Sequence, residues 1–159
     1  MYDRVLLAYD GSREARTALR EGALLARRFT CKVYLLCVVS EGAGVQIGEA
    51  AMPGAVALTR DTYQELFDEA LKKLTELGFK PEGRMVYGEP ALEIAAYARE
   101  VQADLVVVGH RKKNLFERWW SGQTSAYLSD HVGCSVLIAR RTVTDEEFLT
   151  AVGGVKEDA

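Results

Sequence analysis

The sequence predicts a single α/β domain built on a doubly wound, five-stranded parallel sheet with helices on both faces. Five short apolar runs alternate with segments whose apolar residues recur at three- and four-residue steps, the pattern of strands connected by helices. A chain of 159 residues can bury one core without disulfides or metals but is too short for two independent domains. Because every connection is helical, the crossovers should be right-handed and the strands parallel.

The first predicted unit is a strand, a turn and a helix. The apolar run from Arg4 to Tyr9 stops at Asp10-Gly11-Ser12, which suits a strand buried on both faces. From about residue 13 to residue 29 the apolar residues lie on one helical face, and Ser12 or Asp10 can cap that helix. A second buried strand over Val33–Val39 completes a βαβ unit.

The middle of the chain predicts a long loop and a further helix, strand and helix. Residues 40 to about 57 are rich in Gly and Ala and lack periodicity, so we expect a lid or a binding loop. A long amphipathic helix follows and should end at Gly78. A short strand around Arg84–Tyr87 then leads through Gly88-Glu89-Pro90 into a helix that carries core residues from Ala91 to Val101.

The remaining elements are a strand, a loop, a helix and a last strand. They are expected over Asp104–Val108, Gly109–Ser121, Gln123 to about Val132, and Ser135–Ala139. Residues 144–152 show a weak amphipathic pattern. We therefore assign residues 1–140 to the domain and residues 141–159 to a C-terminal extension, a short helix or arm followed by a disordered tail.

The composition excludes several classes of protein. Apolar residues make up 48% and charged residues 27% of the chain, and the net charge is −3, so neither disorder nor a general nucleic-acid-binding surface is indicated. No apolar run approaches the roughly 18–20 residues of a membrane span, and the N-terminus lacks the apolar stretch of a secretory signal. We expect a cytoplasmic protein with no nucleic-acid or membrane partner.

The cysteines and histidines do not indicate a redox or metal centre. Cys31, Cys37 and Cys134 are odd in number and form no Cys-x-x-Cys pair, so we expect them to be reduced and buried. With only His110 and His131 present, neither a His-based metal site nor a Ser-His-Asp arrangement is expected. Any metal site should therefore depend on a bound nucleotide.

Ligands of a doubly wound sheet bind outside the C-terminal ends of its strands, and Asp10 follows the first strand directly. Its carboxylate could accept from a ribose hydroxyl or an adenine, or bind a magnesium ion. The alternative is an Asp that caps the first helix, and the two roles can coexist.

A second candidate site lies between the fourth strand and the next helix. Gly109 ends the strand, and Gly122 opens a helix whose unpaired N–H groups can hold an anion, with hydroxyls from Thr124 and Ser125. The loop between carries four basic residues, Arg111, Lys112, Lys113 and Arg118. The alternative is a solvated basic loop. Trp119 and Trp120 in the same loop either pack back on the domain or anchor a partner.

Taken together, these motifs closely resemble the universal stress protein family. The resemblance rests on Val5–Ser12, on Gly88-Glu89-Pro90 before a helix, on Asp104-Leu-Val-Val-Val-Gly-His and on the closing Cys134-Ser-Val-Leu-Ile. It covers about residues 2–140. It implies a sheet in the order 3-2-1-4-5, like that of adenine nucleotide hydrolases, a homodimer formed through the last strand, and no established catalytic chemistry.

Family members that bind ATP share the pattern Gly-x2-Gly-x9-Gly-Ser/Thr. Gly109 and Gly122 match it, but Lys112 replaces the middle glycine and Gln123 replaces the hydroxyl residue. By this resemblance adenine and ribose would lie against Ala8, Tyr9, Asp10, Val39, Val108 and Gly109. The phosphates would lie near Arg111, Gly122, Gln123, Thr124 and Ser125, and the ammonium group of Lys112 could fold over them.

We therefore predict a regulatory protein of the stress response that binds ATP or a related adenine nucleotide, with Mg²⁺ able to join through Asp10. No residue is an obvious base for activating water, so at most very slow ATP hydrolysis is expected. The alternative is a dimeric interaction module that binds no nucleotide. Lys112 would then remove a phosphate cradle made of main-chain N–H groups, and Gln123 would alter its edge.

Overall fold

The computed structural model describes residues 1–39, 60–109 and 122–153, and its strands form one parallel sheet in the order β3-β2-β1-β4-β5. The strands are β1 (Arg4–Tyr9), β2 (Lys32–Val39), β3 (Glu82–Tyr87), β4 (Leu105–Gly109) and β5 (Ser135–Ala139). Every pair of neighbouring strands is parallel. The predicted fold class and the order 3-2-1-4-5 are confirmed.

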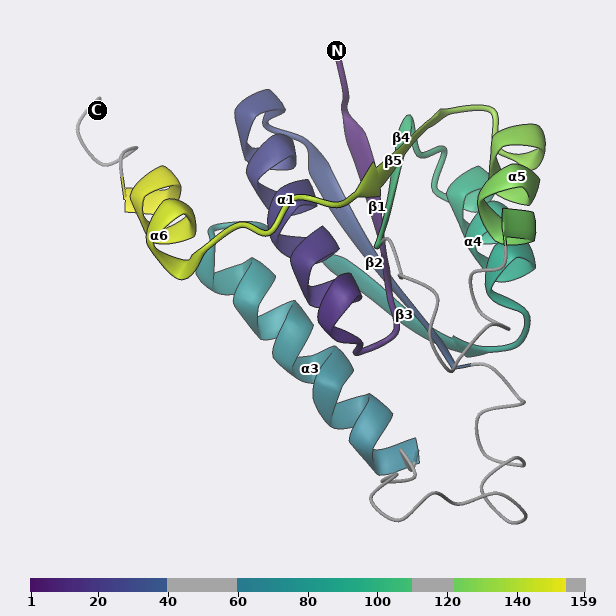
Figure 1. Cartoon of the computed structure of the whole chain (residues 1–159), viewed down its shortest axis with the longest axis horizontal. Coiled ribbons are helices and arrows are strands. Elements are labelled where there is room, and N and C mark those ends of the chain that lie inside the picture. The colour runs from purple at the N-terminus through teal and green to yellow at the C-terminus, as the bar shows by residue number, and fades with distance from the viewer. Residues whose placement is uncertain (40–59, 110–121, 154–159) are drawn as a thin grey trace.

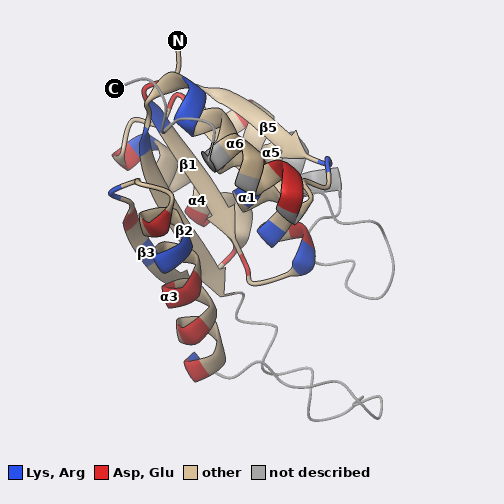
Figure 2. Ribbon diagram, turned by 90° about the vertical axis from the view of Figure 1, so that its left-hand side faces the viewer, with Lys and Arg blue, Asp and Glu red and all other residues tan. Residues whose placement is uncertain are grey.

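Helices cover both faces of this sheet, as predicted. The structure places α1 (Arg13–Phe29) and α3 (Arg60–Glu76) on one side, and α4 (Pro90–Glu100) and α5 (Gly122–His131) on the other (Figure 1). Charged residues recur along α3 (Figure 2), and those in this helix are exposed. Its inner side is apolar and buries Tyr63, Phe67, Ala70 and Leu74. None of the helices in the described ranges is long and apolar enough to cross a membrane.

Each face of the sheet has its own apolar core. Odd-numbered residues of β1, β2 and β4, such as Leu7, Leu35 and Val107, pack with α1 and α3. Even-numbered residues of the same strands, such as Leu6 and Val106, pack with α4 and α5. Successive strand side chains point to opposite faces, so a strand covered on both sides needs apolar residues at every position. This explains the continuous apolar runs.

Several element boundaries differ from the prediction by one or two residues. β2 begins at Lys32, one residue early, and β4 is shifted by one residue to Leu105–Gly109, so that Gly109 belongs to the strand. β3 begins at Glu82, two residues before the predicted start, because Glu82 and Gly83 pair with Tyr34 and Leu35 of β2. Both early residues are exposed, so no apolar signal marks them. α5 begins at Gly122, one residue before the predicted start.

The chain continues past β5 and crosses α1, and its described part ends in helix α6 (Asp145–Gly153) (Figure 1). Val143 is buried in this crossing, and its carbonyl accepts a hydrogen bond of 3.2 Å from Arg20 Nη1. The Arg20 guanidinium also lies 5.7 Å from the centre of the Phe148 ring. The extension therefore contacts Arg20 of α1 both before the start of α6, at Val143, and within α6, at Phe148.

The three thiols are free, and Cys31 and Cys37 are buried as predicted. Cys134 was also expected to be buried but is only half-buried, because it directly precedes the edge strand β5. Three predicted features lie outside the described residues: the lid of residues 40–57, the basic loop after Gly109, and the tail beyond residue 153.

Candidate functional site

The sheet topology brings the C-terminal ends of β1, β2 and β4 to one edge. Strand β1 lies between the other two, with Tyr9 opposite Cys37 of β2 and Leu7 opposite Val107 of β4. Asp10 follows the end of β1, while Val39 ends β2 and Gly109 ends β4. The residues predicted to contact adenine and ribose therefore come from adjacent strand ends.

Asp10 is held in a tight turn. Its Oδ1 accepts a hydrogen bond of 2.9 Å from the Ser12 amide, and Gly11 between them has φ +75°, in the left-handed region. The Ser12 hydroxyl accepts from the Ala15 amide at 3.1 Å and caps α1. Of the two predicted caps, Ser12 therefore fills the N-cap position, and the half-buried Asp10 carboxylate fixes the turn before it.

Gly109 lies against the first turn of α1. A Cβ at this position would come within 2.8 Å of the Glu14 carbonyl oxygen and 3.1 Å of the Ala15 nitrogen. These are main-chain atoms and cannot rotate away. The family resemblance places this glycine against adenine and ribose, and the structure gives a packing reason for it, the close approach of α1 to the end of β4.

Tyr9 and Ala8 point to opposite faces of the sheet. The Tyr9 side chain is 5% exposed, packs in the core with α1 and α3, and is hydrogen bonded by Arg16. Burial raises the pKa of its hydroxyl above the ordinary value, and the Arg16 guanidinium opposes that rise. At the edge Tyr9 therefore presents main chain, whereas the half-buried Ala8 side chain lies on the other face.

The ends of β2 and β4 are well packed. Val39 is 8% exposed and Val108 is fully buried. The Val39 carbonyl accepts a hydrogen bond of 3.1 Å from the Gly88 amide, which ties β2 to the turn before α4. In that turn Glu89 caps α4, since its carboxylate accepts from the Leu92 amide at 3.0 Å. The predicted turn at Gly88-Glu89-Pro90 thus reaches the same edge of the sheet.

The charge of Asp10 affects the neighbouring thiol. The pKa of Cys37 is raised from 9.0 to about 12, mainly because the thiol is buried and further because the Asp10 carboxylate is close. A carboxylate fixed beside three strand ends is suited to accept hydrogen bonds from the hydroxyl or amino groups of a ligand.

The residues predicted to contact phosphate are described only in part. Gly122, Gln123, Thr124 and Ser125 form the first turn of α5, and the structure gives their main chain alone. Arg111, Lys112, Trp119 and Trp120 lie outside the described residues. The structure therefore describes the main chain of the helix start at which anion binding was predicted. A role of the basic loop in that binding stays a prediction.

Comparison with known proteins identifies clear relatives. A model of the universal stress protein family matches residues 1–140. A universal stress protein of Methanocaldococcus jannaschii is 28% identical over 145 residues, which are 89% of this chain and 84% of that protein.

Solved structures share the fold. A universal stress protein in complex with cAMP has a TM-score of 0.63 at 23% identity, covering 89% of this chain and 98% of the other. A family protein from Arabidopsis thaliana with AMP bound has a TM-score of 0.61 at 22% identity, covering 91% and 94%.

Proposed function

Because this chain belongs to the universal stress protein family, we propose that it binds ATP or a related adenine nucleotide at the C-terminal edge of its sheet. The observation that carries the proposal is the Asp10 carboxylate, fixed by the Ser12 amide beside the ends of β2 and β4. The solved family structures that contain cAMP and AMP support an adenine nucleotide as the ligand.

In this proposal each part of the site recognises a different part of the nucleotide. The Asp10 carboxylate accepts hydrogen bonds from the ribose hydroxyls or the adenine amino group. The ends of β2 and β4, at Val39 and Gly109, line the base and sugar. The amides of the first turn of α5 bind phosphate, together with the basic side chains of residues 111 and 112.

We propose that the nucleotide acts as a regulatory ligand in a stress response and not as a substrate. Asp10 and the amides of a helix start provide hydrogen bonds and fixed charge, which recognise a nucleotide. A ligand that binds only the folded chain also stabilises it, so occupancy would report nucleotide concentration as a change in stability.

Calorimetric titration with ATP and AMP, with and without Mg²⁺, tests this proposal. The variant Asp10→Asn keeps a carbonyl oxygen for the Ser12 amide but removes the charge, so it separates recognition from turn structure. A hydrogen bond to a charged group contributes about 1.5–3 kcal/mol, so Asp10→Asn should weaken binding roughly ten- to hundredfold. Asp68→Asn, an exposed carboxylate in α3, is the matched control.

Absence of binding by the wild-type protein at millimolar Mg-ATP would overturn the proposal. That result would favour the interaction module that binds no nucleotide. Equal affinities for wild type and Asp10→Asn would remove Asp10 from the site.

We also propose that two copies associate through β5. In the described sheet β5 is an edge strand that pairs only with β4, and Ile138 on it is 37% exposed. Light scattering on a sizing column should give twice the chain mass for wild type and the chain mass for Ile138→Lys. Leu92→Lys, at a 50% exposed position on α4, should leave the mass unchanged. A monomeric wild type would contradict this assembly.

A further inference from the structure

We propose that Leu66 of α3 is a positioning residue for the Asp10 turn, so that the packing of α3 on the sheet and ligand binding at Asp10 are coupled. The effect on the ligand rests on the proposed function. The effect on the turn does not.

The first observation is the contact between Leu66 and Gly11. A Cβ on Gly11 would lie 2.5 Å from Leu66 Cδ1, so the leucine side chain packs directly on the main chain of the turn. Gly11 joins Asp10 to Ser12, the two residues whose hydrogen bond of 2.9 Å closes the turn. Leu66 is half-buried and packs against the core beneath α1 and α3. It therefore covers the turn on the α3 side.

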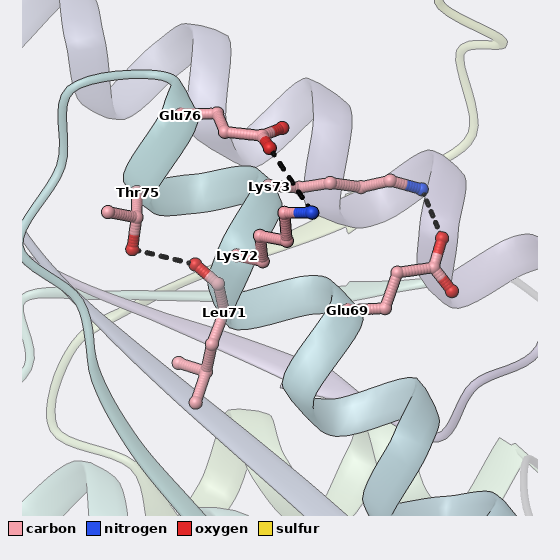
Figure 3. A network of polar contacts seen from close by, with 6 residues as sticks. All are labelled: Glu69, Leu71, Lys72, Lys73, Thr75 and Glu76. Atoms are coloured by element: carbon pink, nitrogen blue, oxygen red, sulfur yellow. Dashed lines mark hydrogen bonds and ion pairs between the residues drawn. The ribbon is translucent and has the colours of Figure 1, made fainter.

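An electrostatic influence of α3 reaches Tyr9, the residue that precedes Asp10. The hydroxyl of Tyr9 is hydrogen bonded by Arg16 of α1, and the Glu69 carboxylate of α3 acts electrostatically on both groups. Glu69 also binds Lys73 one turn along α3, with 2.7 Å between Oε1 and Nζ (Figure 3). Helix α3 thus interacts with the residues on both sides of Asp10, through an apolar contact at Gly11 and through charge at Tyr9.

The consequence follows from thermodynamic linkage. If the Asp10 carboxylate keeps its position only when Leu66 is packed against Gly11, any change that loosens α3 lowers the affinity for the ligand. Binding of the ligand stabilises the packing of α3 by the same free energy. Residues 60–76 would then respond to nucleotide although they contribute no group to the proposed site.

Leu71 provides a matched control on the same helix. It is also half-buried, and it packs on Gly83 of β3, where a Cβ would lie 2.7 Å from Leu71 Cδ2. The Leu71 carbonyl accepts a hydrogen bond of 2.9 Å from the Thr75 hydroxyl, on the same helix as the Glu69–Lys73 pair (Figure 3). Leu66→Ala and Leu71→Ala thus remove the same atoms from α3 at two different glycine contacts.

The experiment measures hydrogen exchange of the Ser12 amide by NMR without nucleotide, and then the dissociation constant for ATP. The Ser12 amide donates the bond that holds Asp10, so its exchange reports the turn directly. Leu66→Ala should speed this exchange and raise the dissociation constant, each by about fivefold or more. Leu71→Ala should match wild type in both, and Leu66→Met should restore both because it fills the same space.

Equal Ser12 exchange in Leu66→Ala and Leu71→Ala would overturn the inference, as would faster exchange with no change in affinity. If Leu66→Ala does not fold, Leu66→Val takes its place with the same expected direction. If the wild-type protein binds no ATP, the proposed function fails, and the Ser12 exchange rates alone decide whether Leu66 positions the turn.

Discussion

Gly109 shows how one residue can satisfy a packing requirement at the edge of the sheet where we propose that nucleotide binds. The main chain of α1 lies where its side chain would be, and the contact joins residues far apart in the sequence. The sequence places Gly109 at a strand end, and the family resemblance places it against the nucleotide. The neighbour that excludes a side chain is known only once the fold brings α1 to the end of β4.

Gly109→Ala should therefore destabilise the fold whether or not a ligand binds. Its Cβ would overlap the Glu14 carbonyl, and such overpacking costs about 1–3 kcal/mol. Urea denaturation measures the loss. Gly133→Ala, which introduces a Cβ with no heavy atom within 4 Å, should change the free energy of unfolding by less than about 0.5 kcal/mol. Equal effects at the two positions would contradict the packing assigned to α1.

Cys37 should make stability depend on alkaline pH. Its folded pKa of about 12 lies above the unfolded value of 9.0, so between these values the unfolded state loses a proton that the folded state keeps. The free energy of unfolding must then fall as the pH rises from 9 towards 12. In urea denaturation the free energy of unfolding of Cys37→Ala should fall less steeply over pH 9–11 than that of wild type. An unchanged pH dependence would contradict the raised pKa of Cys37.

The boundaries of helices and strands can be predicted from the sequence where a capping residue or an apolar pattern marks them. The bounds of α1 agree with the prediction because Ser12 caps its start and the left-handed Thr30 ends it. The start of β3 was missed because Glu82 and Gly83 join the ladder through main-chain pairing, which leaves no apolar pattern. For residues 144–152 the sequence did not decide between a short helix and an extended arm. The cap that decides for α6 is a reciprocal pair of hydrogen bonds between Thr144 and Glu147.

Removal of that cap should loosen α6 locally. The Thr144 hydroxyl accepts from the Glu147 amide at 3.1 Å, and loss of a threonine cap costs about 1 kcal/mol. Thr144→Ala should therefore speed amide exchange in α6 and lower the free energy of unfolding. In Thr75→Ala the lost hydroxyl bonds back to a carbonyl within an exposed helix, so stability should be unchanged or slightly higher. Equal losses would contradict the capping role.

For the whole molecule, the residues predict a parallel sheet but not the order of its strands. Central strands buried on both faces look alike in sequence, and the order 3-2-1-4-5 came from the family resemblance. Asp10 could be placed at the C-terminal edge of the sheet, the proposed binding edge, because it directly follows a strand. The contact between Gly11 and Leu66 could not be predicted, since helical periodicity marks Leu66 as apolar without naming its partner.

The most direct test of the proposed binding site is an NMR titration of backbone amides with Mg-ATP. We predict the largest shifts at Gly11, Ser12, Gly109 and the first turn of α5. Amide shifts at the N-terminal ends of the strands, where the Asp3 amide donates to Asp104 at 2.7 Å, should stay unchanged. No shift at millimolar ATP, or shifts centred on Asp3 and Asp104, would contradict the account.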